Sequence, residues 1–355
     1  MSALWTRATS DSSRRLFPTI PCFCYDITVI FCTLEGIFLF RLENYGISAT
    51  MQAYYLLVIT TLCWGLNAVF ARMAVGEISP MLLVSVRWLG TLVLLVLFAG
   101  KAIIADLPAI RRNFGYSFLL GTVGLGGFGT LIYYSAYTTT AVNIGIIQGA
   151  MPAIVLVGSY FFFRTPVSLL QICGVIVTIL GVVLVSTRGE IERLMTLSFN
   201  TGDLLMLIAV LFYGSYTLGL RRKSDLSSIA LFASVVASAF VSTLPLTIYE
   251  FASGRTVWPG PQYWGLVGLI VLLPSFLSQI CFITSVKLIG PARSGVFINL
   301  VPIFASFFAV VLLEEVFELF QGLSLLLVLS GIYIFEKYKP LPNRVSSNEN
   351  AANAG

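Results

Sequence analysis

From residue 51 onward the chain is a succession of apolar segments, each about 20 residues long and therefore long enough for one helical membrane span. Only helices and closed barrels satisfy every backbone polar group inside a bilayer. We therefore predict an all-α integral membrane protein with ten transmembrane helices. The predicted spans cover residues 53–71, 80–99, 116–137, 143–163, 168–187, 203–220, 228–249, 264–286, 293–313 and 318–336.

Composition supports the membrane class and argues against catalysis. Hydrophobic residues make up 57% of the chain and charged residues 10%, with a mean hydropathy of +0.93, whereas soluble domains carry about 25% charged residues. The chain has no histidine, which removes the commonest general base and metal ligand, and its cysteines lack the spacing of a metal site. We therefore expect no enzyme activity, no metal, no cofactor and no nucleic-acid partner.

The chain contains an internal duplication. Residues 285–331 align without a gap with residues 135–181, at an offset of 150 residues. The identities include a proline, two glycines and a glutamine, which a bias toward apolar residues does not explain. Two halves of five spans each cross the membrane in opposite senses, so the duplication predicts two inverted five-helix repeats, a frequent architecture of secondary transporters.

The first two spans of each half also correspond, at an offset of 149 residues. Trp64 aligns with Tyr213, and Asn67 aligns with Tyr216. In each span the two side chains are three residues apart and therefore lie on one helix face. We interpret the two matched faces as walls of a central substrate site, with placement at the membrane interface, where Trp and Tyr are enriched, as the alternative.

The pattern divides the chain into five parts. Residues 1–50 are an N-terminal extension in which Asp26 and Glu35 interrupt an apolar stretch at a high insertion cost, and we hypothesise that Met51 is an alternative, native start. The other parts are the first repeat (51–187), an outer connecting loop (188–202), the second repeat (203–336) and a disordered cytoplasmic tail (337–355).

Loop charges predict the orientation. With both termini cytoplasmic, the inner loops and the tail carry most of the lysines and arginines, whereas the outer loops carry few, as the positive-inside rule requires. We therefore predict a multi-pass protein of the cell (inner) membrane with both ends inside.

These residues resemble the EamA family of the drug/metabolite transporter superfamily over about residues 53–336. The resemblance rests on family motifs that match Trp64-Gly65, Pro80, Arg87-Trp88, Pro302 and Glu315. The chain departs from the family at Glu314, where a glycine is usual, and at Arg164-Thr165, where Gly-Glu is common.

The resemblance implies a secondary transporter of a small metabolite, amino-acid-like or a related organic solute, with export as the expected direction and alternating access as the mechanism. The partners are then the small-molecule substrate and the lipid bilayer, and the oligomeric state stays open between a monomer and a homodimer. The alternative is a non-transporting membrane component, such as a flippase-type subunit that acts with a partner protein.

Polar residues within the predicted spans are the candidates for substrate binding, because polar groups that face lipid are costly. Besides the two matched faces, they are Arg87, Tyr133, Tyr134, Gln148, Ser275, Gln279 and Asn299. Interhelical hydrogen bonding is the alternative for the hydroxyls and amides. Arg87 either pairs with a substrate carboxylate or serves structure by extending its charge toward the membrane surface.

Five residues are candidates for hinges or close helix packing, because Gly and Pro interrupt or narrow a helix. They are Gly124, Gly127, Pro152, Pro274 and Pro302. Two of the glycines belong to a GLGGFG segment that fits a dinucleotide-binding pattern, but the acidic residue expected about 20 positions later is missing. No Asp or Glu lies in the middle of a predicted span, which favours facilitated diffusion, exchange or coupling without a buried acid.

Overall fold

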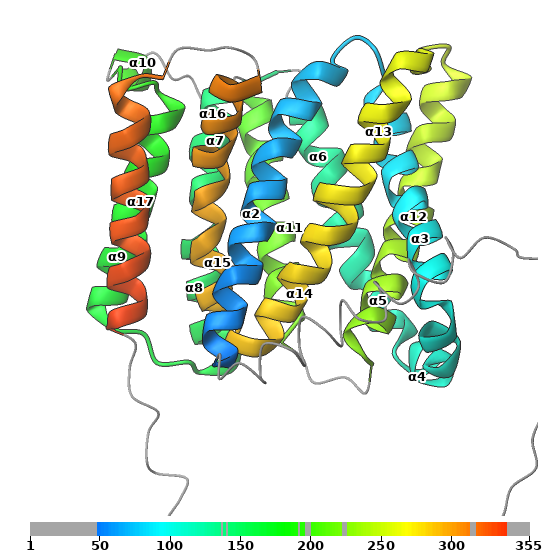
Figure 1. Cartoon of the computed structure of the whole chain (residues 1–355), viewed down its shortest axis with the longest axis horizontal. Coiled ribbons are helices and arrows are strands. Elements are labelled where there is room, and N and C mark those ends of the chain that lie inside the picture. The colour runs from blue at the N-terminus through cyan, green and yellow to red at the C-terminus, as the bar shows by residue number, and fades with distance from the viewer. Residues whose placement is uncertain are drawn as a thin grey trace, which may run out of the picture.

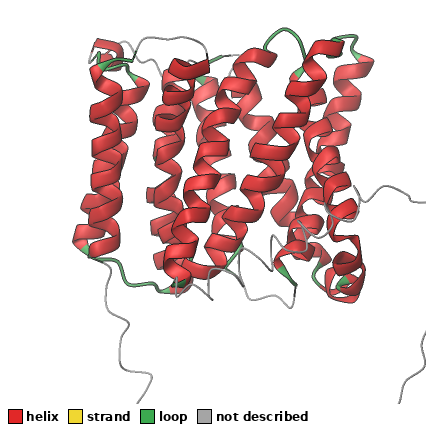
Figure 2. Ribbon diagram, in the orientation of Figure 1, coloured by secondary structure: helices red, strands yellow, loops and turns green. Residues whose placement is uncertain are grey.

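The computed structural model describes residues 48–135, 138–139, 141–190, 192–195, 200–221, 226–312 and 317–338. Within these ranges the chain is helical between its turns and loops (Figure 2). Ten helices there are long and apolar enough to cross a membrane, which confirms the predicted spans. Of the N-terminal extension, residues 48–50 are described: the Ser48 hydroxyl accepts a hydrogen bond from the N–H of Met51 at 3.3 Å and caps the first helix, which begins at Ala49. The interpretations of residues 1–47, of the tail beyond residue 338 and of the turn at Glu314 and Glu315 concern residues outside the described ranges.

The ten spans are formed as follows. In the first half they are α2 (Ala49–Ala74), α3 (Pro80–Ala105), α5–η1–α6 (Phe114–Leu120, Gly121–Gly127, Phe128–Ser135), α7–α8 (Ala141–Gly149, Met151–Phe163) and α9 (Leu169–Ser186). In the second half they are α11 (Thr201–Gly219), α12 (Ser228–Ala252), η2–α13–η3–α14 (Pro261–Tyr263, Trp264–Ile270, Val271–Leu277, Ser278–Ile289), α15–η4–α16 (Pro291–Phe297, Ile298–Leu300, Val301–Leu312) and α17 (Leu319–Lys337). Two short surface helices, α4 (Leu107–Arg112) and α10 (Glu192–Met195), lie between spans.

The glutamine that is identical in the two halves, Gln171 and Gln321, lies in the first turn of the last span of each half. Gln171 accepts a hydrogen bond from the backbone N–H of Ser168 at 3.2 Å, and Gln321 accepts one from the N–H of Glu318 at 2.7 Å. Each bond satisfies one of the backbone donors that a helix start leaves without a partner. The glutamine is therefore identical in the two repeats because it caps the start of the last span in the same way in each.

The helices pair across the two halves. In Figure 1, α9 and α17 form a pair at one side of the bundle, and α3 and α12 lie together at the other. Between them, α2 packs against α14 and α16, while its counterpart α11 packs against α6 and α8. These contacts of α2 and α11 are therefore equivalent in the two halves, as two inverted repeats require.

The equivalence holds at single residues. A Cβ atom on Gly65 would lie 2.6 Å from Cβ of Phe304, and one on Gly214 would lie 3.0 Å from a side-chain carbon of Ile154. Gly214 is the repeat counterpart of Gly65, and Ile154 is the counterpart of Phe304. Glycine at both positions lets the first helix of each half approach the fourth helix of the other half closely.

Both halves also contain a π-helical segment at the same repeat position. The segment η1 covers Gly121–Gly127, and η3 covers Val271–Leu277, 150 residues later. π-Helical turns are rare and often lie at functional sites. In the first segment four glycines allow neighbouring helices to approach, whereas in the second Pro274 removes a backbone donor.

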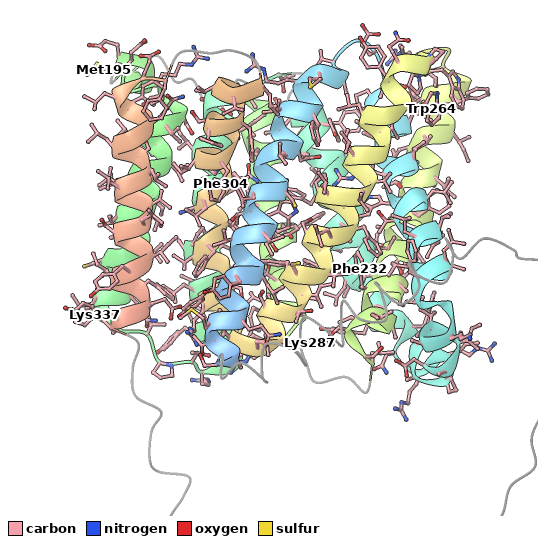
Figure 3. All side chains as sticks on the ribbon, in the orientation of Figure 1. Met195, Phe232, Trp264, Lys287, Phe304 and Lys337 are labelled. Carbon is pink, nitrogen blue, oxygen red and sulfur yellow. The ribbon has the colours of Figure 1, made fainter. Side chains whose placement is uncertain are left out.

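The bundle has two ends, which we name by residues labelled in Figure 3. Lys287 and Lys337 lie at one end, which we call the Lys337 end. Met195 and Trp264 lie at the opposite end, which we call the Met195 end. The helix α2 begins at the Lys337 end and finishes at the Met195 end (Figure 1).

Candidate functional site

An aromatic cluster joins the two halves in the interior of the bundle. The ring of Tyr213 packs edge-on against Trp64, with ring centroids 5.7 Å apart, and also contacts Phe128 at 5.0 Å and Tyr216 at 5.4 Å. Phe282 packs against Trp64 at 5.2 Å. Trp64 from α2 and Tyr213 from α11, which the sequence predicted to be equivalent, therefore meet directly at the interface of the two halves.

Three polar atoms in this cluster lack a protein partner. Among the described residues, the hydroxyl groups of Tyr213 and Tyr216 and the side-chain oxygen of Gln279 are buried, and none of them has a partner at strict hydrogen-bonding distance and angle. The side chains of Tyr213 and Gln279 lie close enough for a weak hydrogen-bonding interaction, which falls short of the geometry of a formed hydrogen bond. Because a buried polar group without a partner costs about 1–3 kcal/mol, these atoms are suited to bind a polar ligand.

Pro274 explains how the second π-helical segment builds a polar contact. Proline has no N–H, so the carbonyl of Ile270, four residues earlier, loses its helical donor. The hydroxyl of Ser275 donates to that carbonyl at 2.7 Å. The same hydroxyl oxygen accepts a hydrogen bond from Nε of Arg87 at 3.0 Å. Through Ser275, the helix break at Pro274 in the second half is therefore hydrogen-bonded to Arg87 in the first half.

Arg87 lies inside the bundle. Its guanidinium carbon is 4.8 Å from the centroid of the Trp88 ring, and it interacts electrostatically with the phenols of Tyr133 and Tyr213. The side chain is half-buried. These contacts place its charge beside the aromatic cluster and against η3, rather than extended toward the membrane surface.

Two of the candidate glycines, Gly124 and Gly127, leave room for aromatic side chains of α11 to pack against the helix backbone. A Cβ atom on Gly124 would lie 2.4 Å from Cβ of Tyr216, and one on Gly127 would lie 2.8 Å from the ring of Phe212. Both separations are shorter than a carbon–carbon contact. The first π-helical segment therefore carries glycine because α11 packs directly against it.

The candidate prolines stand next to helix breaks. Pro152 is in the first turn of α8, directly after the interruption that separates α7 from α8. Pro302 occupies the matching place in the other half, at the start of α16 and after the 3₁₀ turn η4. Bending at these breaks remains a prediction.

Other candidates lie apart from the cluster. Tyr134 is 40% exposed, although its neighbour Tyr133 is half-buried. Asn299 is buried and donates to the hydroxyl of Thr178 on α9 at 2.9 Å, which is an interhelical bond. Asn67 and Gln148 are half-buried, and no contact of either with the cluster is seen.

Sequence reasoning missed part of the cluster. Phe128 and Phe282 stand within apolar runs rich in phenylalanine, so nothing in the sequence marked them out. It also missed two polar clusters, one toward each end of the bundle.

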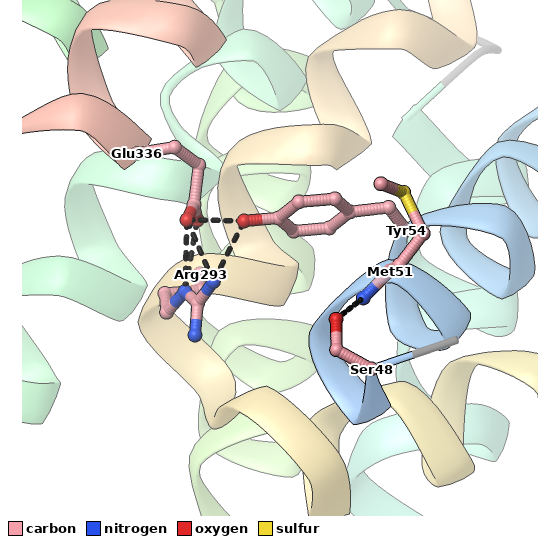
Figure 4. Close-up of polar contacts among 5 residues, drawn as sticks. All are labelled: Ser48, Met51, Tyr54, Arg293 and Glu336. Atoms are coloured by element: carbon pink, nitrogen blue, oxygen red, sulfur yellow. Dashed lines mark hydrogen bonds and ion pairs between the residues drawn. The ribbon is translucent and has the colours of Figure 1, made fainter. Parts of the chain in front are cut away.

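The cluster at the Lys337 end joins three helices, as Figure 4 shows. Arg293 on α15 forms a salt bridge with Glu336 on α17, with its Nη2 2.7 Å from Oε2 and its Nε 3.0 Å from each carboxylate oxygen. The same Nη2 donates to the hydroxyl of Tyr54 on α2 at 2.7 Å, and that hydroxyl donates to Glu336 at 2.5 Å. We call these three residues the Arg293 cluster.

The cluster at the Met195 end is its repeat counterpart. Asp203, which corresponds to Tyr54, is buried at the start of α11 and accepts a hydrogen bond from Asn143 at 2.8 Å. Asn143 corresponds to Arg293. Asp203 also accepts a hydrogen bond from Thr139 and one from the backbone N–H of Asn200 at 2.9 Å. We call Asp203, Asn143 and Thr139 the Asp203 cluster.

An inverted-repeat bundle of ten spans with a polar aromatic site between its halves is the architecture of a membrane transporter. The EamA-like transporter family matches residues 51–187 and again residues 200–336, so the chain belongs to that family, within the drug/metabolite transporter superfamily. It is therefore a membrane transporter and not an enzyme.

Several curated relatives are similar over most of their length. The uncharacterized transporter YyaM of Bacillus subtilis (strain 168) is 25% identical over 284 residues, which is 79% of this chain and 92% of YyaM. The uncharacterized transporter YetK of the same organism is 23% identical over 303 residues, or 84% and 91% of the two chains. A crystal structure that is 15% identical superposes with a TM-score of 0.68, covering 79% of this chain and 95% of the other, and shows the same fold.

Proposed function

We propose that the protein is a secondary transporter that exports a small, amphipathic or zwitterionic organic solute, amino-acid-like or related, by alternating access. The observation that carries the proposal is the aromatic cluster between the halves, where the hydroxyl groups of Tyr213 and Tyr216 and the oxygen of Gln279 are buried without partners. Aromatic faces would bind the apolar part of the solute, and the unpartnered atoms would bind its polar part.

The two polar clusters support alternating access. A site between the halves must open to one side of the membrane at a time, and the Arg293 and Asp203 clusters fasten opposite ends of the bundle. The first ties α2 to α15 and α17, and the second ties α11 to α7. The two clusters occupy equivalent positions in the two repeats. The motion that opens one end of the bundle and breaks one cluster is therefore equivalent to the motion that opens the other end and breaks the other cluster. Each open state of the carrier would then keep one cluster and lose the other, whereas both clusters are formed in this structure.

The proposed orientation assigns each cluster to one side of the membrane, and export, which the family resemblance implies, then sets the order in which the clusters open. The Lys337 end carries the basic loops and would face the cytoplasm, with both termini inside and the protein in the cell (inner) membrane. Solute would then enter after the Arg293 cluster opens and leave after the Asp203 cluster opens. For binding to favour this change, the solute must contact the two states differently.

Counterflow in proteoliposomes tests the proposal. Vesicles containing the purified full chain and preloaded with one unlabelled solute are given the same solute in labelled form, across a panel of amino acids and small organic acids. Transient accumulation of one class of solute is expected. Absence of accumulation by a folded protein would contradict the proposal and favour a membrane component that acts with a partner protein. Vesicles without protein and vesicles preloaded with buffer alone are the controls.

A further inference from the structure

We propose that Arg87 binds a carboxylate of the transported solute and thereby restricts the transporter to carboxylate-bearing solutes. The inference rests on the proposed function and specifies the substrate class of the same site.

The first support is a charge without a protein counter-ion. The groups that the structure places beside the Arg87 guanidinium are the hydroxyl of Ser275, the ring of Trp88 and the phenols of Tyr133 and Tyr213. None of them is a carboxylate, and no salt bridge to Arg87 is found within the described ranges. An uncompensated cation inside a membrane span is costly and is usually retained for function. A solute carboxylate would supply the missing charge.

The second support is the way the guanidinium is held. Ser275 uses its hydrogen on the Ile270 carbonyl, so its oxygen can only accept from Arg87. This bond engages Nε and fixes the plane of the guanidinium. The phenol of Tyr133 takes part in a further hydrogen bond with the guanidinium. The guanidinium carries five N–H donors in a planar fork that suits the two oxygens of a carboxylate, so donors remain for a solute after these two bonds.

The third support is a departure from repeat symmetry. Val236 occupies the position of Arg87 in the second half, and Leu125 occupies the position of Ser275 in the first. Both apolar counterparts are buried. The fold therefore packs these two positions with apolar side chains where no charge is present. The Arg87–Ser275 pair is thus an addition to the repeat rather than a requirement of it.

The surroundings define a second feature of the solute. Tyr213 links the Arg87–Ser275 pair to Gln279, because its side chain interacts electrostatically with Arg87 and lies within weak hydrogen-bonding reach of Gln279. The unpartnered oxygen of Gln279 can accept a hydrogen bond but cannot donate one. A solute with a carboxylate and a nearby N–H or O–H donor would satisfy both groups.

Thermal unfolding of the purified full chain tests the inference without requiring transport. The probes are amino acids, aliphatic carboxylic acids and aromatic carboxylic acids, each compared with its own primary amide. We expect at least one acid to raise the unfolding midpoint of the unmodified protein, and to bind between about tenfold and a hundredfold more tightly than its amide, because hydrogen bonds to charged groups are strong. Equal stabilisation by acid and amide, or no stabilisation by any acid, would overturn the inference.

The matched variant is Arg87→Val, because valine already fills this position in the other half. We expect it to fold with a midpoint no lower than that of the unmodified protein and to lose the preference for the acid. Arg87→Lys keeps the charge without the fork and should retain part of the preference. A lower midpoint of Arg87→Val with an unchanged preference would show that the arginine is structural and would overturn the inference.

Counterflow separates this inference from the proposed function. Transport of acids and amides alike would leave the function standing and overturn the assignment of Arg87. Acid-selective binding without any counterflow would support the assignment and contradict the transport.

Discussion

Gly174 and Gly331 face each other across the α9–α17 pair. A Cβ atom on Gly331 would lie 2.6 Å from the carbonyl oxygen of Gly174, and one on Gly174 would lie 2.8 Å from the carbonyl oxygen of Gly331. In a bilayer, helices associate through close packing of small residues rather than through a hydrophobic driving force. The last helices of the two halves are therefore held together by backbone contact at this point.

Gly331→Ala should separate α9 from α17. The added methyl group meets backbone, which cannot rotate away, so we expect a loss of about 1–3 kcal/mol in stability. The measurement is the thermal unfolding midpoint in detergent. Gly268→Ala on α13 is the matched control, because nothing lies within 4 Å of a Cβ atom there. Equal midpoints for the two variants would contradict the close contact.

Gly124→Ala should disturb Tyr216 specifically. The new Cβ atom would overlap the Tyr216 side chain, so we expect a loss of about 1–3 kcal/mol that depends on the ring. In a double-mutant cycle, Tyr216→Gly removes both the Cβ atom and the ring that the new methyl group would meet, and the cost of Gly124→Ala should then largely disappear. Additive losses in unfolding free energy would show that the glycine serves another purpose.

Glu336→Gln should favour the state open at the Lys337 end. The substitution removes the salt bridge to Arg293 while keeping a side chain of similar size. Cys63 and Cys281 are buried reporters near the aromatic cluster. In a background with the other four cysteines replaced by serine, we expect faster reaction with an impermeant maleimide in inside-out vesicles.

Asp203→Asn is the mirror of that variant. It weakens the Asp203 cluster, and the two reporter thiols should then react faster in right-side-out vesicles. The unsubstituted four-serine background is the control for both. Unchanged rates, or faster rates from the same side in both variants, would contradict opposed clusters.

Single cysteines test the proposed orientation. Ser253 follows α12 at the Met195 end, and Ala105 ends α3 at the Lys337 end; both are exposed. In a cysteine-free background, Ser253→Cys should react with an impermeant maleimide in intact cells, whereas Ala105→Cys should react only after permeabilisation. The reverse pattern would place the Lys337 end outside the cytoplasm and the Met195 end inside, and would contradict the proposed orientation.

The sequence predicted the architecture because membrane insertion is dictated by local properties. Span length and apolar composition are read directly from the chain, and the ten helices follow them. The repeat predicted which helices are equivalent, and the structure adds matched π-helical segments and matched glycines. Pro274 was expected to interrupt its helix, but only the structure shows that the Ser275 hydroxyl donates to the Ile270 carbonyl and accepts a hydrogen bond from Arg87.

Side-chain partners were less predictable, because they depend on how helices rotate and tilt in the bundle. Tyr133 and Tyr134 are adjacent in sequence, yet one is half-buried and the other is exposed. Arg293 is the first residue of a predicted span, and nothing in the sequence indicated that it pairs with Glu336 on another helix. Asn299 was a candidate for substrate binding, with interhelical bonding as the alternative, and the structure shows its bond to Thr178 on α9. Apolar periodicity does not resolve such cases where every face of a helix is apolar.

The central claim is that the interior between the halves is the substrate site, and Tyr213→Phe tests it most directly. The substitution removes only the unpartnered hydroxyl group and leaves the ring contacts with Trp64 and Phe128 in place. Counterflow of the transported solute and the unfolding midpoint are measured together. We predict a midpoint equal to or above that of the unmodified protein, with apparent affinity reduced about threefold to tenfold, the value of one neutral hydrogen bond. Unchanged transport in Tyr213→Phe, and also in Trp64→Ala, would contradict the claim.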